Sequence, residues 1–485
     1  MNIALIYPKS LPGIPYGLLF IGAVLEQNNF NVAIFDNDSN DHHFIKSIIN
    51  FKPDIIGYSL NTMQISRAIE INLILKQHLP NAIYVAGGVH TTALPYDTIK
   101  LLDLDYAILH EGEYTMLELC QYLKKGKDPH NIKGIAYIKD DKLIRTEFRP
   151  FIKDLDSLPY PARHLINFKN YILPPGSIRG QWIKRSTYYL SSRGCPFNCS
   201  FCASPMLWKR RVRVHSIDRI INEIKFLIKE YNIEAIQFLD DILGINTTRV
   251  IQLCDRIKQE KLNLKFSCQL RVDTINEKML KALKSAGFVQ IEFGIESGSN
   301  KILKIFNKET NKDKIREAVK LVKKFNMRTM GSFIIGNPYE TEEDLRETEK
   351  LAEELDLDFA DFFILTPFPG TGIYEMAIKN KWIKNFNYKT WDITTPVMEI
   401  NFSRHYIEKK RAFLENKFAK KKYQYYIKHP YTLFSIFVIF ITHPLSILYG
   451  LKKFLKTFSI NDFTINFLRH WRYSVINSEG NKKNH

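Results

Sequence analysis

Three cysteines lie close together in the sequence and carry its strongest chemical signal. Cys195, Cys199 and Cys202 have C-x-x-x-C-x-x-C spacing and follow a short apolar segment, 187–192, that we predict to be a strand. Three thiolates on one loop can bind three irons of a cubane cluster and leave the fourth iron without a protein ligand. An amino acid can chelate that open iron through its amino and carboxylate groups, so that an electron can enter an adjacent sulfonium.

The other three cysteines do not extend this group. A zinc knuckle needs four ligands, whereas Cys120, Cys254 and Cys268 lie in helical or strand patterns rather than in a second pair. We expect Cys254 and Cys268 to be buried thiols. The clustered cysteines, and a first segment without a basic region and a long apolar stretch, predict a reducing cytoplasmic location.

The segment around the cysteines resembles the radical S-adenosylmethionine superfamily, over about residues 185–380. Matching pieces follow in order at predicted strand ends: Phe201, FLDD at 238–241, RVD at 271–273, GIES at 294–297, GSFIIG at 331–336 with Glu340 and Thr341, and TPFPGT at 366–371. The resemblance implies a 4Fe–4S cluster on the three cysteines, with Asp241, Arg271 and Glu296 contacting S-adenosylmethionine. Two alternatives stay open: Asp240 or Asp241 could cap the next helix, and Arg271 could form a structural ion pair.

The elements that must position these residues form a regular series. Strand candidates near residues 187, 235, 264, 289, 329 and 361 alternate with helical patterns. Such repeats build parallel barrels whose reactive groups lie at the strand ends. The sequence therefore predicts an α/β protein with a partial (β/α)6, TIM-like catalytic barrel at 185–382.

Residues 1–140 also alternate short apolar runs with helical stretches, which predicts a doubly wound, Rossmann-like parallel sheet. Ligands of such sheets bind at the carboxyl ends of the strands. It contains PYGL at 15–18, PDIIGYS at 53–59, a Gly-Gly turn followed by His90, and EGE at 111–113. With these pieces the region resembles the cobalamin-binding domain of one radical S-adenosylmethionine subclass. The resemblance implies cobalamin contacts from the following residues: Tyr16, Ser59, Gly87, Gly88, His90 and Glu111. Gly87 and Gly88 would let the backbone approach a bulky planar ligand, and Ser59 could donate to its buried nucleotide tail.

One departure concerns the cobalt ligand. Cobalamin enzymes with a protein imidazole below the metal carry D-x-H-x-x-G after the first strand, where this chain has Tyr7-Pro8-Lys9. We therefore expect a displaced dimethylbenzimidazole tail with no histidine below the cobalt. His90 as a ligand, or a domain that binds nothing and serves as a scaffold, are the alternatives.

The remaining segments differ in composition from both domains. Prolines become more frequent over 141–184, which predicts a semi-extended linker. The region 383–485 is predicted to be helical, and residues 401–485 carry 16 Lys and Arg against 4 Asp and Glu, or +12 of the net +18. Residues 429–451 contain no charged side chain. We expect an anchor lying in the surface of an anionic membrane, with a single span or a buried core helix as alternatives.

The resemblance implies an enzyme that cleaves S-adenosylmethionine reductively and methylates, or forms a C–C bond on, an unactivated carbon. The apolar, basic tail favours a hydrophobic lipid or isoprenoid-like substrate at the cytoplasmic face of the membrane. A reductant such as flavodoxin or ferredoxin is expected as a partner. The alternatives are a soluble-substrate methyltransferase or cyclase, an RNA-modifying enzyme, and a membrane-bound sensor. No nucleic-acid partner is expected, because a long apolar run is unlike a solvated nucleic-acid patch.

Overall fold

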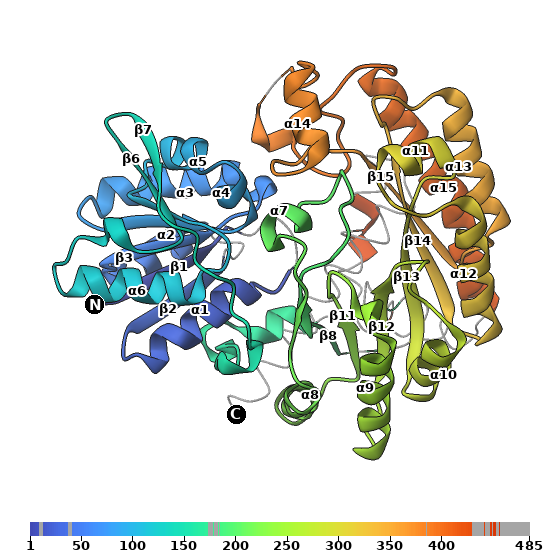
Figure 1. Cartoon of the computed structure of the whole chain (residues 1–485), viewed down its shortest axis with the longest axis horizontal. Helices are drawn as coiled ribbons and strands as arrows, with labels where there is room; N and C mark the ends of the chain where they lie inside the picture. The colour runs from blue at the N-terminus through green and yellow to red at the C-terminus, as the bar shows by residue number, and fades with distance from the viewer. Residues whose placement is uncertain are drawn as a thin grey trace.

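The computed structural model describes residues 1–8, 13–36, 41–172, 178, 183, 185–384, 386–428, 441, 447, 448, 450–452 and 455. Two α/β units lie side by side, with the short helix α7 (Ser204–Trp208) between them (Figure 1). Each unit is built on its own sheet. The predicted fold class is confirmed.

The first sheet has seven strands in the order β2-β1-β3-β4-β5-β6-β7. The strands are β1 (Asn2–Tyr7), β2 (Asn31–Asp36), β3 (Ile55–Ser59), β4 (Ile83–Gly87), β5 (Tyr106–Ile108), β6 (Ile135–Lys139) and β7 (Lys142–Arg145). The first five are parallel, whereas β6 and β7 form an antiparallel edge. Because β7 ends at Arg145, the sheet extends into the segment predicted as linker.

Helices cover both faces of this sheet. They are α1 (Tyr16–Gln27), α2 (Asp41–Phe51), α3 (Ile65–His78), α4 (Val89–Ala93), α5 (Pro95–Leu102) and α6 (Glu113–Lys124). Along β1, Ile3 and Leu5 join the apolar cluster of α1 and α6, and Ala4 and Ile6 join that of α2, α3 and α5. Strands buried on both faces are continuously apolar, which is why NIALIY is readable as a strand.

The second sheet is entirely parallel, in the order β15-β14-β13-β12-β11-β8. Its strands are β8 (Ser186–Tyr189), β11 (Ala235–Phe238), β12 (Lys265–Leu270), β13 (Phe288–Glu296), β14 (Arg328–Ile335) and β15 (Phe359–Ile364). A small hairpin, β9 (Ser192–Arg193) with β10 (Arg213–Val214), encloses the cysteine loop and α7. The six predicted repeats are confirmed as a six-stranded half-barrel.

Polar caps set where the barrel helices begin. The helices are α8 (Ile217–Tyr231), α9 (Thr247–Gln259), α10 (Glu277–Ser285), α11 (Asn300–Ile305), α12 (Lys312–Lys324), α13 (Glu342–Glu354) and α14 (Gly372–Lys379). The Asn246 side chain accepts the Arg249 N–H and caps α9. The alternative that Asp240 or Asp241 caps this helix is therefore wrong.

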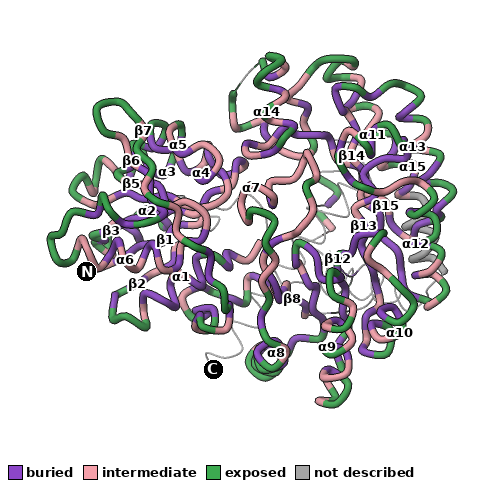
Figure 2. The backbone as a smooth tube through the Cα atoms, viewed as in Figure 1, coloured by how far each residue is buried: buried purple, intermediate pink, exposed green. Residues whose placement is uncertain are grey.

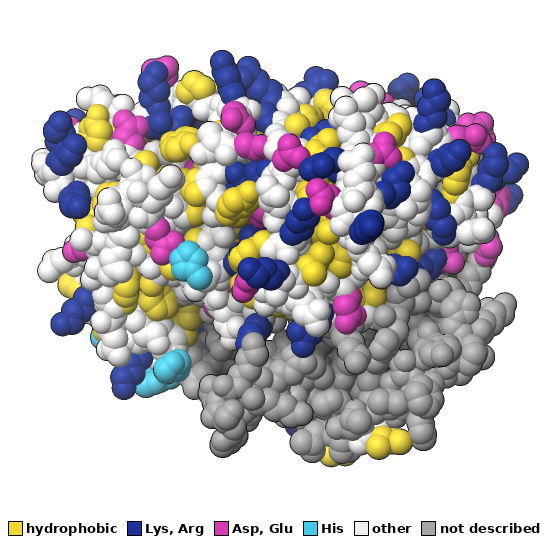
Figure 3. Space-filling view, turned by 90° about the horizontal axis from the view of Figure 1, so that it is seen from below, with side chains coloured by type: hydrophobic (Ala, Val, Ile, Leu, Met, Phe, Trp, Pro, Cys, Tyr) yellow, Lys and Arg dark blue, Asp and Glu magenta, His cyan; other side chains and the backbone are white. Residues whose placement is uncertain are grey.

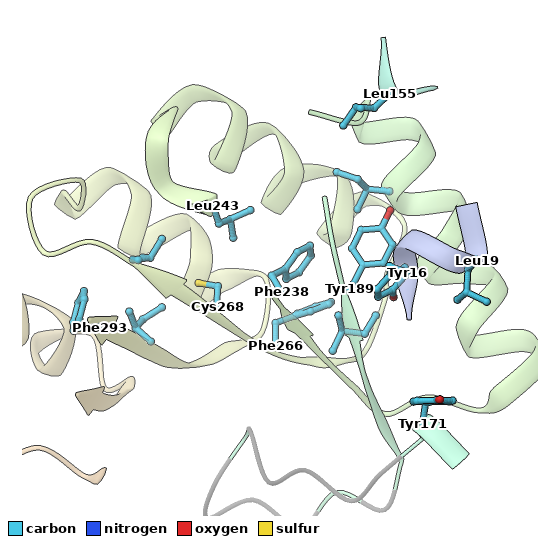
Figure 4. Close-up of a cluster of buried hydrophobic side chains, with 14 of the residues drawn as sticks. Tyr16, Leu19, Leu155, Tyr171, Tyr189, Phe238, Leu243, Phe266, Cys268 and Phe293 are labelled. Carbon is cyan, nitrogen blue, oxygen red and sulfur yellow. The ribbon is translucent and has the colours of Figure 1, made fainter. Parts of the chain in front are cut away.

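The segment that joins the two units is packed. Leu155, Leu158 and Phe168 are buried, and Arg163 pairs with Glu223 of α8 at 2.5 Å. Figure 4 shows Tyr16 of α1 beside Tyr189 of β8 in one apolar cluster. The segment predicted as a linker therefore contributes buried side chains to the packing between the two units, and Figure 2 shows buried stretches along it.

Helix α15 (Arg404–Lys428) also belongs to the barrel. Ile407, Leu414 and Phe418 are buried, and Phe418 contacts the Phe362 ring of β15. The Glu415 carboxylate accepts the Phe362 N–H at 2.7 Å. This helix lies in the region 383–485 that we predict to be helical, and it covers the edge strand of the open sheet.

The predicted membrane segment 429–451 lies almost wholly outside the described residues. Among the described residues, no helix is long and apolar enough to span a bilayer. On the described part of the face in Figure 3, lysines and arginines are interspersed with acidic and apolar side chains.

Candidate active site

A cavity of about 390 Å³ lies where the two units meet. The first unit lines it with α1, α6 and the ends of β3, β4 and β5, and the barrel lines it with residues including Ser192, Arg193, Trp208 and Asp241. A second cavity of about 340 Å³ shares Tyr16, Ser59 and Gly88 with it. The carboxyl ends of the first sheet therefore face the loop that carries the cysteines.

The larger cavity has an apolar part that lies against the first sheet. Leu5, Gly57, Val85 and Met116 line an apolar slot between the sheet and its helices. A Cβ atom on Gly57 would lie only 3.1 Å from Leu5, whereas one on Gly17 would meet nothing nearer than Ser59 Oγ at 4.0 Å. Gly57 thus allows close packing against Leu5, and Gly17 leaves space beside the Ser59 hydroxyl, where the displaced nucleotide tail of a cobalamin would fit.

Most residues predicted to bind cobalamin line this cavity. They are Tyr16, Ser59, Gly87, Gly88 and Glu111. The Tyr16 hydroxyl donates to the Tyr188 carbonyl at 2.6 Å, and burial raises its pKa to about 12. Tyr16 therefore joins the first unit to β8 as a neutral phenol.

His90 is placed apart from the other predicted cobalamin residues. Its Nδ1 lies 3.0 Å from the Thr62 hydroxyl, its ring packs edge-on against Tyr388, and it does not line either cavity. Burial lowers its pKa to about 4, so this imidazole is neutral.

His110 lines the cavity and was not among the residues predicted from the sequence. Its Nδ1 lies 2.8 Å from the Leu207 carbonyl of α7, and it has a left-handed backbone (φ 62°). Burial lowers its pKa. In the sequence, only its position next to Glu111 and just after β5 suggests that His110 could belong to the site.

The three cysteines lie on the loop between β9 and α7, and all three are partly buried. The Ser200 N–H donates to the Phe306 carbonyl, and the Ser200 carbonyl accepts the Ile373 N–H, which ties the loop to α11 and α14. Burial raises the pKa of Cys202 to about 12. Iron must therefore displace a proton from this thiol when it binds.

Within the described residues, no three His, Cys, Asp or Glu side chains are close enough to hold one metal ion together. A cubane makes a different demand, because each cysteine binds its own iron. Asp241, one predicted S-adenosylmethionine residue, accepts the Gly194 N–H at 2.9 Å and lines the cavity. It therefore connects the cysteine loop to the space between the two units.

Arg271 lies against the cysteine loop. Its guanidinium is 3.5 Å from Cys199 Sγ and 3.5 Å from the centroid of the Phe197 ring. It also forms two hydrogen bonds with Asp273, at 2.9 and 2.6 Å. Both readings of Arg271 are thus compatible with the structure, because the ion pair with Asp273 holds the cation beside Cys199.

Glu296 ends β13 in a left-handed conformation (φ 66°), where the register with β14 shifts. Its carboxylate accepts from Lys308 Nζ at 2.7 Å, and a Cβ atom on Gly294 would collide with it. Strained backbone at a non-glycine residue is typical of functional sites. The charges of Arg271, Lys308 and Glu296 all act on Cys199, so the structure brings these groups together at the loop.

A buried ion network crosses between the two units. Arg193, two residues before Cys195, pairs with Glu111 at 2.7 Å and with Glu113 at 2.6 Å. Arg213 of β10 donates to both Glu111 oxygens at 2.7 Å. Glu111 therefore lines the predicted cobalamin cavity and also holds the hairpin that encloses the cysteine loop.

Comparisons with known proteins agree with this arrangement. A model of the radical SAM superfamily matches residues 189–352, and a model of the B12 binding domain matches residues 10–120. An uncharacterized methyltransferase of Pyrococcus horikoshii is 36% identical, over 82% of this chain and 86% of the relative. The anaerobic magnesium-protoporphyrin IX monomethyl ester cyclase of Rubrivivax gelatinosus is 28% identical, over 84% of this chain and 76% of the cyclase.

Solved structures share the fold. The radical S-adenosylmethionine methyltransferase TsrM of Kitasatospora setae, with cobalamin and a [4Fe-4S] cluster bound, superposes with a TM-score of 0.66 at 18% identity, over 80% of this chain and 76% of that one. With two domain models in the observed order and a relative this similar over most of both chains, the protein belongs to the cobalamin-dependent radical S-adenosylmethionine enzymes, which use a 4Fe–4S cluster, S-adenosylmethionine and cobalamin.

Proposed function

We propose that this enzyme methylates an unactivated carbon of a hydrophobic, lipid-like substrate. The observation that carries the proposal is the cavity shared by the cobalamin domain and the residues around the cysteine loop, because it can hold an acceptor carbon between the two cofactors. When bound, the cluster and S-adenosylmethionine supply a radical that removes a hydrogen atom, and cobalamin supplies the methyl group.

The residues of this chain orient and enclose the reactants. Cys195, Cys199 and Cys202 would hold the cluster, and the Arg271 cation beside Cys199 suits a carboxylate bound there. Aromatic and aliphatic lining, including Phe20 and Trp208, would exclude water from the reacting carbon.

Two features support the hydrophobic substrate. The hopanoid C-3 methylase of Methylococcus capsulatus is 24% identical over 79% of this chain, and its name specifies a lipid substrate. The uncharged segment 429–451 and its flanking lysines suit a membrane surface, where such a substrate would be found.

The experiment is an anaerobic incubation of the reconstituted enzyme with titanium(III) citrate as the electron donor, S-adenosylmethionine carrying a CD3 group, cobalamin, and either the lipid extract or the aqueous extract of the native cells. We expect a trideuterated methyl group in a lipid, detected by mass spectrometry, and none with a Cys202→Ala control. Label confined to the aqueous extract would contradict the proposal and favour the soluble-substrate alternative.

We also propose that the tail attaches the enzyme to the cytoplasmic face of an anionic membrane. A chain ending at Lys428 keeps the packed part of α15 and is expected to lose binding to anionic vesicles while it retains its iron. The apolar segment and its lysines act together there, at roughly 1 kcal/mol per lysine near the lipid. Vesicle sedimentation measures this, with neutral vesicles as a control, and equal binding by the shortened chain would exclude the tail as the anchor.

A further inference from the structure

Three consecutive cations follow the cysteine loop. Lys209, Arg210 and Arg211 form the turn between α7 and β10, and all three are exposed. Among the described residues, none of them has a carboxylate partner. This basic turn, Lys209 to Arg211, is therefore positive charge that no carboxylate of the described part of the chain neutralises.

The basic turn is built directly onto the cysteine loop. Arg210 Nε donates to the Pro196 carbonyl at 2.9 Å, next to Cys195. Gly194 (φ 94°) passes so close to the Arg211 carbonyl that a Cβ atom would collide with it. The fold thus places three cations that have no carboxylate partner among the described residues beside the backbone that carries the first cluster cysteine.

The backbone of the turn is strained. Lys209 and Arg210 both have left-handed conformations (φ 48° and 59°), which cost about 1 kcal/mol or more for residues other than glycine. The Lys209 ammonium also lies 3.5 Å from the centroid of the Phe148 ring, which fixes its position. Glycine or asparagine would adopt this backbone conformation with less strain. Lys209 and Arg210 therefore contribute positive charge at these positions rather than a favourable backbone conformation.

We propose that the basic turn is the docking surface for an acidic one-electron carrier protein that reduces the cluster. The proposal rests on the cluster assignment, and only an electron moves: the reduced carrier is oxidised by one electron, the cluster is reduced by one, and no bond forms or breaks. Electron transfer slows steeply with distance, so the carrier must dock against the cluster loop. A cation patch there steers and orients an acidic protein.

The test compares the native enzyme with a Lys209→Asp/Arg211→Glu variant. Aspartate tolerates the left-handed conformation at 209, and Arg210 is kept because it bonds the cysteine loop. We measure calorimetric binding of an oxidised, acidic flavodoxin to each full-length protein at low and high salt. We expect the variant to bind roughly tenfold or more weakly and to lose most of the salt dependence.

Cluster reduction gives a second readout. Stopped-flow reduction by flavodoxin hydroquinone should slow by a similar factor in the variant, whereas reduction by titanium(III) citrate should not change. A Lys278→Glu/Lys281→Glu control on α10, where both lysines are exposed and distant from α7 (Figure 1), should retain native affinity.

Unchanged flavodoxin affinity in the variant, or an equal loss in the α10 control, would overturn the proposal. So would equal slowing with titanium(III) citrate, because the turn would then act on the cluster itself, and so would a loss of binding to anionic vesicles with flavodoxin binding unchanged. Flavodoxin binding does not depend on methylation, so its failure would leave the proposed methyltransferase activity standing.

Discussion

Replacing Cys195, Cys199 and Cys202 together with alanine is expected to reduce bound iron from about four atoms per chain to background and to abolish S-adenosylmethionine cleavage. The loop then offers no thiolate, so no iron remains to chelate the amino acid part of S-adenosylmethionine. Iron content and chromatography of 5′-deoxyadenosine and S-adenosylhomocysteine, after anaerobic reconstitution, measure the two effects.

A Cys254→Ala variant is the matched control. Cys254 is fully buried in α9 and belongs to the apolar core, so its loss should cost stability and leave iron content unchanged. Native levels of S-adenosylmethionine cleavage in the triple variant would refute the cluster assignment.

The repeating pattern of the chain predicts most of the fold. Parallel strands buried on both faces, such as those of NIALIY and VQIEFG, stand out as apolar runs between helical segments. Helix α15 is harder to predict, because lysines and arginines surround the buried side chains of Ile407, Leu414 and Phe418. Helix α15 packs against the open edge strand β15. This edge exists only once the sheet has assembled, so the local sequence of the helix does not indicate the contact.

The candidate site likewise contains residues that the sequence predicts and residues that it does not. The cysteine loop is local, so its spacing predicts its chemistry. Glu111 and Arg193 lie in separate domains and meet only through tertiary packing, and no periodicity indicates that one neutralises the other. His90 shows the opposite case: it lies near the glycine turn in sequence, yet its helix turns the ring toward Thr62 and Tyr388.

The stability of the ion network between the two units should therefore depend on the charge of Glu111. We expect Glu111→Gln to destabilise the protein by about 3–5 kcal/mol and to lower its apparent Tm by roughly 10 °C, because it leaves the buried Arg213 cation without its carboxylate. Among the described residues Arg213 then keeps only the neutral Ile152 carbonyl, which accepts from Nη1, because Nε and Nη2 have no hydrogen-bond partner there. Cobalamin binding should weaken as well, since Glu111 lines the cavity.

A second substitution separates a broken charge pair from a general packing defect. In Glu111→Gln/Arg213→Met the stranded cation is gone, and most of the lost stability should return, because replacing both members of a buried pair by neutral groups costs little. Glu118→Gln, which breaks the more exposed pair with Arg149, should cost less than about 1 kcal/mol. Thermal unfolding of the native protein and the three variants distinguishes these two explanations. If the double variant unfolds as early as Glu111→Gln, the carboxylate acts through packing, and the network does not hold the cysteine hairpin to the cobalamin domain.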